Sequence, residues 1–153
     1  MGDPFTFLEP GPLEDGELAL TLATRQNAEE SIWGVPAYIF HMRLLPGHQK
    51  LGRITLRAAD SDWVVRYTGH VGYAVDEPFR GRGYAERGCR LLLPFVKRHG
   101  WAELWITCGP DNPASRRTLE RLGAEWVETV DVPPDYPLAA GVVRQKCRYR
   151  LKL

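Results

Sequence analysis

Apolar positions recur with the period of strands along most of the chain and with the period of helices in two segments. Alternation of apolar and polar side chains indicates a half-buried strand, whereas a 3.6-residue repeat indicates an amphipathic helix. The alternation predicts strands at 17–24, 37–45, 51–56, 70–76, 104–108, 125–130 and 142–151. The short polar segment 26–33 is expected to form one or two helical turns, and 60–69 a connection with strand character at 63–67.

The two amphipathic segments are predicted helices. The first runs over 86–99, and its apolar face is formed by Cys89, Leu92, Leu93 and Val96. Pro94 lacks a backbone donor, which costs about 3 kcal/mol inside a helix, so we expect a kink or an early break near Arg90. The second helix runs over 113–122, with Asn112 as a good N-cap.

Together these elements predict an α/β fold in which a mixed, mostly antiparallel sheet carries helices on both faces. The strands before residue 70 are joined by short loops and are therefore expected to be antiparallel. The strand–helix–strand unit at 70–108 is expected to be a right-handed parallel crossover. A length of 153 residues fits a single domain over 1–153.

Composition and charge narrow the classes of partner. Hydrophobic residues make up 44% of the chain and charged residues 25%, which is typical of a globular domain. A net charge of +1 without a basic run gives no reason to expect nucleic acid or a membrane surface as a partner. No apolar stretch approaches the ~18 residues of a membrane span, and the acidic segment 1–12 does not resemble a signal peptide.

The cysteines give no sign of a disulfide framework or a metal site. Cys89, Cys108 and Cys147 are scattered, form no C-x-x-C pair, and are not clustered with the four histidines. We therefore expect no metal and a reducing, cytoplasmic location.

The segment with the clearest chemistry lies between the strand at 70–76 and the helix at 86–99, and it reads Arg80-Gly81-Arg82-Gly83-Tyr84-Ala85. The first backbone N–H groups of a helix have no internal partners, and the helix dipole adds partial positive charge there. The glycines let a phosphate approach the main chain, and the arginines add cationic forks. This order of strand, glycine-rich turn and helix predicts an anion site, with a pyrophosphate as the expected ligand.

Four interpretations of this loop are open from its residues alone. A dinucleotide fingerprint G-x-G-x-x-G would need glycine where Glu86 stands, and a P-loop would need Lys-Ser/Thr where the chain has Cys89 and Arg90. An ordinary glycine-rich turn would bind nothing. The fourth pattern, Q/R-x-x-G-x-G/A, is matched by Arg80, Gly83 and Ala85.

The fourth pattern and the segments around it resemble the GCN5-related N-acetyltransferase (GNAT) family, and in particular a poorly characterised bacterial acetyltransferase subfamily. The resemblance covers about 51–153, and it is carried beyond the loop by Gly69-His70-Val71-Gly72-Tyr73, Thr107-Cys108, Asp111-Asn112 and Leu122-Gly123-Ala124. It implies a GNAT-like sheet that splays between two parallel central strands. A pantetheine arm would then hydrogen-bond between those strands like an extra strand.

The resemblance also implies which residues touch acetyl-CoA, the expected co-substrate. The backbone of 73–75 would hold the pantetheine and the thioester carbonyl, with donors that act as an oxyanion hole. The backbone of 81–85 would hold the pyrophosphate. Asn112 and Ser115 stand where family members touch the cofactor, although capping of the following helix explains both equally well. The expected cofactor contacts are Tyr73, Ala74, Val75, Arg80, Gly81, Arg82, Gly83, Tyr84, Ala85, Asn112 and Ser115.

The sequence indicates the catalytic residues less clearly than the cofactor contacts. His70 is the ionisable group on the strand before the loop and the candidate general base, although strand alternation puts it on the face opposite Tyr73. Many family members protonate the leaving thiolate with a tyrosine on the last helix, where this chain has Leu119. The thiolate leaves unassisted, or its proton comes from one of Tyr84, Tyr136, Tyr149, Cys108 and Ser115. The catalytic candidates are therefore His70, Ser115 and Tyr149.

The function implied by the resemblance is transfer of an acetyl group from acetyl-CoA to a primary amine, by direct attack on the thioester. The acceptor would be a small molecule, a peptide or a protein N-terminus. The missing tyrosine leaves a non-catalytic acyl-CoA-binding module as the alternative, and the broken glycine patterns disfavour a redox or phosphotransfer protein. The residues leave open whether the chain forms a homodimer, which is frequent in the family. We expect the acceptor pocket to come from the N-terminal third and the loop at 132–141, with aromatic linings among Trp33, Tyr38, Phe40 and Trp63.

Overall fold

The computed structural model of the chain describes residues 5–137 and 144–153. Its strands are β1 (Leu13–Glu14), β2 (Leu18–Gln26), β3 (Ala37–Leu44), β4 (Gln49–Arg57), β5 (Val71–Val75), β6 (Glu103–Cys108), β7 (Glu125–Asp131) and β8 (Gln145–Lys152). Its helical elements are the π-helix η1 (Val64–Thr68), the 3-10 turn η2 (Glu77–Phe79), and the α-helices α1 (Tyr84–Lys97) and α2 (Pro113–Arg121).

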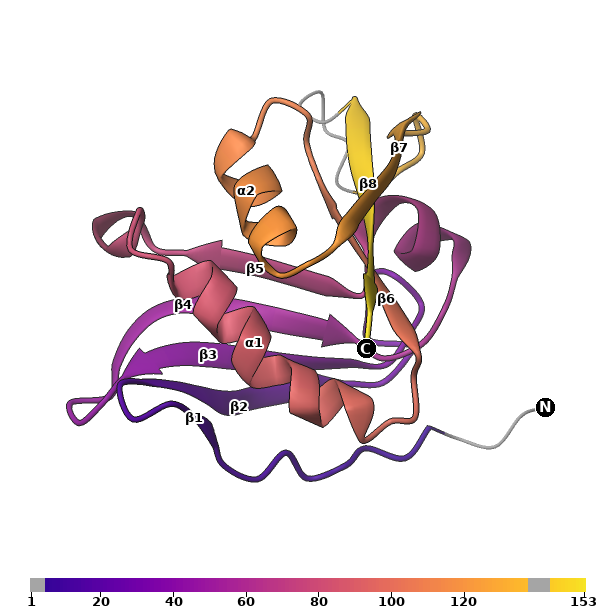
Figure 1. Cartoon of the computed structure of the whole chain (residues 1–153). Coiled ribbons are helices and arrows are strands. Elements are labelled where there is room, and N and C mark those ends of the chain that lie inside the picture. The colour runs from indigo at the N-terminus through magenta and orange to yellow at the C-terminus, as the bar shows by residue number, and fades with distance from the viewer. Residues whose placement is uncertain (1–4, 138–143) are drawn as a thin grey trace.

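The strands form two antiparallel sheets (Figure 1). Strands β1 to β5 lie side by side in chain order, and β8 lies between β6 and β7. Strands β5 and β6 share no ladder; an isolated bridge joins Gly69 to Ile106 just before β5 begins. We call this unpaired junction between β5 and β6 the splay. Strands β5 and β6 on either side of the splay are the splayed central pair of the expected fold. Because they share no ladder, the strands form two sheets where a single sheet was expected.

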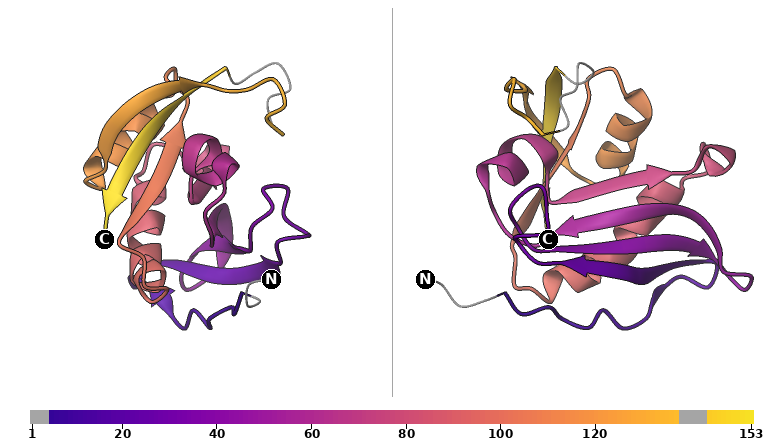
Figure 2. Two further views of the ribbon diagram at one scale, coloured as in Figure 1. Left: turned by 90° about the vertical axis from the view of Figure 1, so that its right-hand side faces the viewer. Right: turned by 180° about the vertical axis from the view of Figure 1, so that it is seen from behind.

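Helices lie on both sides of the second sheet. α1 packs against β2 and β5, α2 packs against β6, and η1 packs against β6 and β8. Figure 2 shows α1 and α2 on one side of the second sheet and η1 on the other. We call these the α side and the η1 side, and the expectation of helices on both faces is confirmed here.

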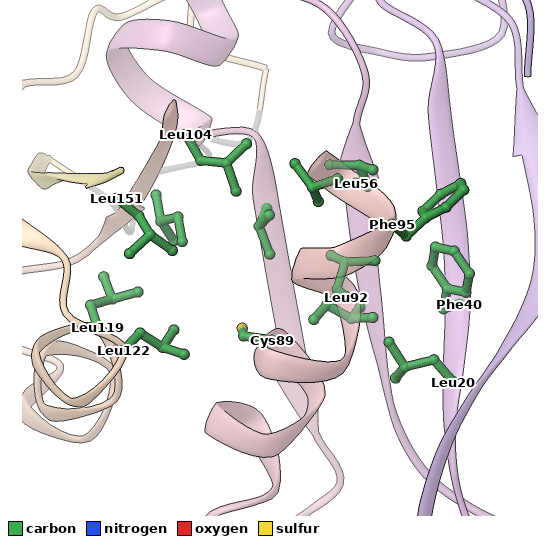
Figure 3. Close-up of a cluster of buried hydrophobic side chains, with 14 of the residues drawn as sticks. Leu20, Phe40, Leu56, Cys89, Leu92, Phe95, Leu104, Leu119, Leu122 and Leu151 are labelled. Carbon is green, nitrogen blue, oxygen red and sulfur yellow. The ribbon is translucent and has the colours of Figure 1, made fainter. Parts of the chain in front are cut away.

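The main core fills the α side (Figure 3). Leu92 and Phe95 of α1 face Phe40 and Leu56 of the first sheet, and all four side chains are fully buried. The rings of Phe40 and Phe95 meet edge to face with centroids 6.0 Å apart. Leu119 of α2 continues the same core toward the second sheet. This packing fixes the start of α1, and with it the glycine-rich loop, against β5.

A smaller cluster lies on the η1 side. Its buried members come from the segment after β2, from η1 and from the segment after β7, and they are Trp33, Val35, Val64 and Tyr136. The ring centroid of Tyr136 lies 5.2 Å from that of Trp33 and 5.8 Å from that of Trp63. Of the expected aromatic linings, Trp33 and Trp63 belong to this cluster. Tyr38 and Phe40 are instead fully buried in the main core.

The segment 63–67 is helical, so its predicted strand character was wrong. The β-branched and aromatic side chains there favoured a strand, but burial follows helical spacing, with Val64 and Thr68 buried. Ser61 stabilises the start of η1, because its Oγ accepts the N–H of Val64 at 3.2 Å. Gly69 ends η1 with a φ of +79° and donates its N–H to the Val64 carbonyl at 2.7 Å.

Two other local expectations are corrected. In the segment 26–33, Gln26 ends β2 and the remaining residues form turns without a helix, and Asn27 and Glu30 each accept the backbone N–H of the other through their side chains. Helix α1 begins at Tyr84 and continues through Pro94, so the early break near Arg90 does not occur. Pro94 is exposed, and burial of the opposite face of α1 offsets the lost hydrogen bond. Residues 142–143 of the last predicted strand lie outside the described residues.

His70 closes the narrow end of the splay. Its backbone N–H donates to the Trp105 carbonyl at 2.6 Å, and its ring Nδ1 accepts the Trp105 N–H at 2.9 Å. With Nδ1 as an acceptor, the neutral ring carries its proton on Nε2, which donates to Oδ1 of Asp60 at 2.7 Å. Burial lowers the pKa of His70 in spite of the nearby Asp60 carboxylate. The neutral imidazole therefore acts as a clasp between β5 and β6.

Because the His70 ring must stay neutral to keep both of its hydrogen bonds, we expect the folded state to lose stability in acid. The unfolded chain binds a proton at His70 as pH falls below about 6.5, whereas the folded state resists it, so the free energy of unfolding should fall by up to about 1.4 kcal/mol per pH unit. Chemical denaturation of a His70→Gln variant should show lower stability at pH 7.5 and a shallower pH dependence between pH 7 and 5. A His41→Gln variant measures how much of the pH dependence comes from His41, because burial lowers the pKa of that residue as well. An unchanged slope in His70→Gln would contradict the clasp.

Candidate active site

The glycine-rich loop joins the end of β5 to the start of α1. Gly81 and Gly83 both have a φ of +79°, a left-handed conformation that glycine adopts without steric cost. A Cβ at either position would meet no atom within 4 Å, so the main chain is open to a close approach. Gly83 is the N-cap of α1, and no side chain caps that end. The N–H groups of the first turn are therefore available to an anion.

The other loop residues have different surroundings. Arg80 donates from Nε to the Val75 carbonyl at 2.8 Å and thereby ties the loop to the end of β5. Arg82 is exposed, as is expected for a side chain that meets a phosphate from solvent. Tyr84 is buried and lies 5.5 Å below the guanidinium of Arg87. Its side chain is therefore part of the packing, and Tyr84 can offer a ligand only its backbone.

The edge of β5 that faces the splay carries free main-chain groups. The hydrogen bond from the Asp76 N–H to the Leu51 carbonyl (2.8 Å) fixes which residues of β5 pair with β4. Because alternate residues of an antiparallel strand bond to the same neighbour, Ala74 turns its main chain to β4, while Tyr73 and Val75 turn theirs to the splay. Of these groups only the Val75 carbonyl is occupied within the described part of the chain, by the side chain of Arg80. The sheet already uses the N–H and C=O of Ala74, so contact of this residue with a cofactor stays a prediction that its main-chain hydrogen bonds do not support.

The side chain of Tyr73 reaches from β5 to the first turn of α2. Its hydroxyl lies 2.6 Å from Oγ of Ser115, and either oxygen can be the donor. Burial raises the pKa of Tyr73 well above its ordinary value, so the phenol keeps its proton at neutral pH. Two hydroxyl groups that can donate hydrogen bonds are thus brought together between β5 and α2.

Asn112 caps α2, as its sequence position indicated. Its Oδ1 accepts the Ser115 N–H at 3.2 Å, which leaves the Ser115 hydroxyl to Tyr73. Contact of Asn112 with a cofactor stays a prediction.

Two of the three catalytic candidates are placed unfavourably for catalysis. Both ring nitrogens of His70 are occupied, so neither can accept a proton from an amine. Tyr149 is fully buried on β8, and its hydroxyl accepts a hydrogen bond from Nε of Arg116 at 3.1 Å. Strand β6 stands between β8 and the splay. Ser115 is the candidate that the fold brings to β5.

Sequence reasoning assigned a role to the backbone of Tyr73 and missed its side chain. Alternation with Val71 and Val75 indicated that this side chain faces the core. The alternation could not indicate that the first turn of α2 lies opposite it, because 42 residues separate Tyr73 from Ser115. Arg57 and Lys146, two basic residues on the η1 side, were missed for the same reason.

Over residues 5–137 and 144–153, no group of three or more His, Cys, Asp or Glu side chains could hold a metal ion. No helix in this part of the chain is both long and apolar enough to cross a membrane.

Comparisons with known proteins agree with this geometry. A family model described as an acetyltransferase (GNAT) domain matches residues 4–125. No curated protein sequence matches the chain.

Several solved acetyltransferase structures share the fold. The ribosomal-protein-S5-alanine acetyltransferase from Vibrio fischeri has a TM-score of 0.68 at 15% identity, over 92% of this chain and 96% of that one. The RimL ribosomal L7/L12 alpha-N-protein acetyltransferase in complex with coenzyme A has 0.68 at 14% identity, over 93% and 98%. A microcin C7 self-immunity acetyltransferase in complex with acetyl-CoA and AMP has 0.60 at 19% identity, over 76% and 61%.

At these identities the structural matches establish the fold, and the family model carries the assignment. That model spans most of the chain, including the glycine-rich loop, both helices and the residues that face the splay. The protein therefore belongs to the acetyltransferase (GNAT) domain family, whose members are acetyl-CoA-dependent N-acetyltransferases.

Proposed function

We propose that this protein transfers the acetyl group of acetyl-CoA to a primary amine by direct attack of the amine on the thioester. The observation that carries the proposal is the unpaired main-chain edge of β5, where the N–H and C=O of Tyr73 and the N–H of Val75 are free, and which leads into the open loop at Gly81 and Gly83. An unpaired strand edge binds an extended ligand through hydrogen bonds of the kind that join strands. The amide groups of a pantetheine arm are such a ligand, and its pyrophosphate suits the loop.

The loop would contribute most of the binding free energy. Each charge-assisted hydrogen bond from a backbone N–H to a phosphate oxygen contributes roughly 1.5–3 kcal/mol. Several such bonds from the first turn of α1 suffice for micromolar affinity, which corresponds to about 8 kcal/mol. Arg82, exposed beside them, adds a cationic fork without an obstructing neighbour.

Groups that face the splay would stabilise the charges that develop on the oxygen and the sulfur of the thioester during the reaction. A backbone N–H of Tyr73 or Val75 that faces the splay is a fixed donor for the oxyanion that forms when the amine attacks the thioester carbon. One of the hydroxyls of Tyr73 and Ser115, whichever does not donate to the other, would donate to the sulfur as the C–S bond breaks. A phenol with a raised pKa does not give up its proton to a thiolate whose conjugate acid has a pKa near 8.5. Tyr73 would therefore stabilise the thiolate as a hydrogen-bond donor.

The acceptor amine must arrive neutral. His70 offers no free nitrogen, so the proposal favours amines that lose their proton to water at small cost. At pH 7 that cost is about 1 kcal/mol for an α-amine and about 4–5 kcal/mol for a lysine-like amine. The acceptor would thus be an α-amine of a small molecule, a peptide or a protein. Two of the similar structures are named as ribosomal-protein acetyltransferases, which supports an α-amine of a polypeptide among the candidates.

A non-catalytic acyl-CoA-binding module is the second candidate. It is favoured by Leu119, which is fully buried where many family members carry a tyrosine acid. This candidate predicts acetyl-CoA binding without release of CoA on any amine. Turnover measured on a panel of α-amines and lysine-like amines separates the two.

A matched pair of glycine variants tests the loop. Gly83→Ala and Gly100→Ala place a Cβ at left-handed positions, φ +79° and +82°, where nothing lies within 4 Å. Both should therefore lose similar stability, of the order of 1–2 kcal/mol. Calorimetry should show that acetyl-CoA affinity falls by about tenfold or more in Gly83→Ala only, because that Cβ would keep the phosphate from the main chain. Equal affinities in the two variants would remove the loop assignment.

Removal of single hydroxyls tests the thiolate donor. Tyr73→Phe and Ser115→Ala should each lower kcat by about 10- to 100-fold while acetyl-CoA affinity stays within about twofold. Because the two hydroxyls act together, the double variant should be little worse than either single one. Tyr149→Phe removes a buried hydroxyl that β6 separates from the splay, and it should keep the wild-type kcat. A wild-type kcat in Tyr73→Phe would exclude this role.

A further inference from the structure

The η1 side of β8 carries a row of four basic residues. Cys147, Tyr149 and Leu151 are buried in the main core, so their neighbours in sequence turn to the opposite side. The row consists of Lys146, Arg148, Arg150 and Lys152. Arg148 confirms this direction, because its guanidinium donates to the Val65 carbonyl of η1 at 3.0 Å.

The two middle residues of this row are neutralised, and Lys152 at its C-terminal end is exposed to solvent. Arg148 pairs with Glu128 at 3.0 Å, and Arg150 lies 3.8 Å from Glu103 and 3.5 Å from Glu125. Lys146 has no carboxylate partner among the described residues. The undescribed segment 138–143 contains no aspartate or glutamate either. Over residues 5–137 and 144–153, Lys146 is therefore a half-buried ammonium group without a counter-ion.

A second unpaired cation stands across the splay. Arg57, at the end of β4, donates from one terminal nitrogen to the carbonyls of Thr68 and Gly69 at 3.2 and 3.0 Å. Its guanidinium lies 5.5 Å from the ring of Trp33, and within residues 5–137 and 144–153 it pairs with no carboxylate. Nε of Arg57 is buried and has no partner there. A Cβ on Gly72 would lie 2.9 Å from the other terminal nitrogen, so this cation touches the main chain of β5.

The two cations lie near each other on the η1 side. Thr107 of β6, which pairs with Arg148 beside Lys146, donates its hydroxyl to the Tyr67 carbonyl at 2.7 Å, and Arg57 donates to the next two carbonyls along the chain. Burial, and next the charge of Arg57, lowers the pKa of Lys146. Burial lowers the pKa of Arg57 to about 10. Like charges held together in a partly desolvated place are destabilising, and proteins keep them where a ligand of opposite charge completes the site. The place lies beside Gly72, one residue from the main-chain groups of Tyr73 that the proposed reaction uses.

We propose that Arg57 and Lys146 bind a carboxylate of the acceptor, so that the substrate is an amine that carries its carboxylate a few bonds from the reacting nitrogen. This inference rests on the proposed function and gives its substrate class. A planar guanidinium and a flexible ammonium on opposite sides of the splay suit a carboxylate, and together they repel di- and polyamines. Trp33 and Tyr136 pack beside Arg57, and because both are buried they hold the guanidinium in place.

Three matched acceptors test the carboxylate. Phenylalanine, phenylalaninamide and 2-phenylethylamine share one side chain, and they differ in whether a carboxylate, an amide or neither is present. The amide has the least basic amine, so a preference for phenylalanine cannot come from easier deprotonation. In the wild-type protein, kcat/KM for phenylalanine should be about 10- to 100-fold higher than for phenylalaninamide and 2-phenylethylamine, which corresponds to one or two charge-assisted hydrogen bonds.

Lys146→Gln, with Lys152→Gln as the matched control at the exposed end of the same strand, identifies the residue responsible. Lys146→Gln should raise the KM for phenylalanine by about tenfold and leave 2-phenylethylamine unchanged, and Lys152→Gln should change neither. The side chain of Lys146 makes no hydrogen bond among the described residues, so this variant should fold. Arg57→Gln removes the bonds to Thr68 and Gly69 as well, and it serves only as a second variant.

Other outcomes overturn the proposal. Equal kcat/KM for the three acceptors would exclude a carboxylate site. A fall in kcat with an unchanged KM in Lys146→Gln would make Lys146 a proton acceptor instead. Higher activity on the peptide amide Ala-Asp-Phe-NH2 than on both Ala-Asn-Phe-NH2 and phenylalanine would place the carboxylate on a polypeptide side chain.

A binding measurement separates this proposal from the proposed function. N-acetylphenylalanine should bind the CoA-loaded protein by calorimetry, and N-acetylphenylalaninamide should bind at least about tenfold more weakly. That difference should disappear in Lys146→Gln. If this affinity difference is observed while no amine is acetylated, the carboxylate site is supported and the transferase activity is excluded. If amines are acetylated and the difference is absent, the transferase activity is supported and the carboxylate site is excluded.

Discussion

The arrangement of this protein depends on one contact between its two sheets. His70 holds β5 and β6 together through its backbone N–H and its ring Nδ1, both bonded to Trp105. Beyond this point the strands share no ladder. A strand edge that is neither paired nor covered is usually avoided in proteins, because it invites association. Here the edge is kept unpaired by the divergence of β6, and it is short enough to be filled by one extended ligand.

The splay also separates two chemical environments. On the α side, the hydroxyls of Tyr73 and Ser115 meet between β5 and α2, next to the loop that offers N–H groups to an anion. On the η1 side, Arg57 and Lys146 lie near each other beside an aromatic cluster. A thioester held between these sides would release its sulfur on the side of the hydroxyls. The acceptor amine would attack it from the side of the two cations. The two proposals therefore describe opposite faces of one site.

Local rules predicted much of this molecule. The loop at 80–85, the cap at Asn112 and most strand positions follow from glycine, capping residues and alternation, which act over a few neighbouring residues. The failures came where distant contacts decide. Segment 63–67 contains strand-forming side chains, yet it is helical because Val64 and Thr68 are buried on its inner face. His70 carried the right chemistry for a base, but Trp105 and Asp60 occupy its ring nitrogens, and no sequence pattern shows that.

The central claim is that the main-chain edge of β5 binds acetyl-CoA. Amide hydrogen exchange measured by NMR, with and without saturating acetyl-CoA, tests it residue by residue. The account predicts slower exchange at Tyr73 and Val75 together with the first turn of α1, and no change at the exposed edge strand β7. Protection at the loop alone would mean that the splay does not hold the pantetheine arm. No protection at either place would contradict the account as a whole.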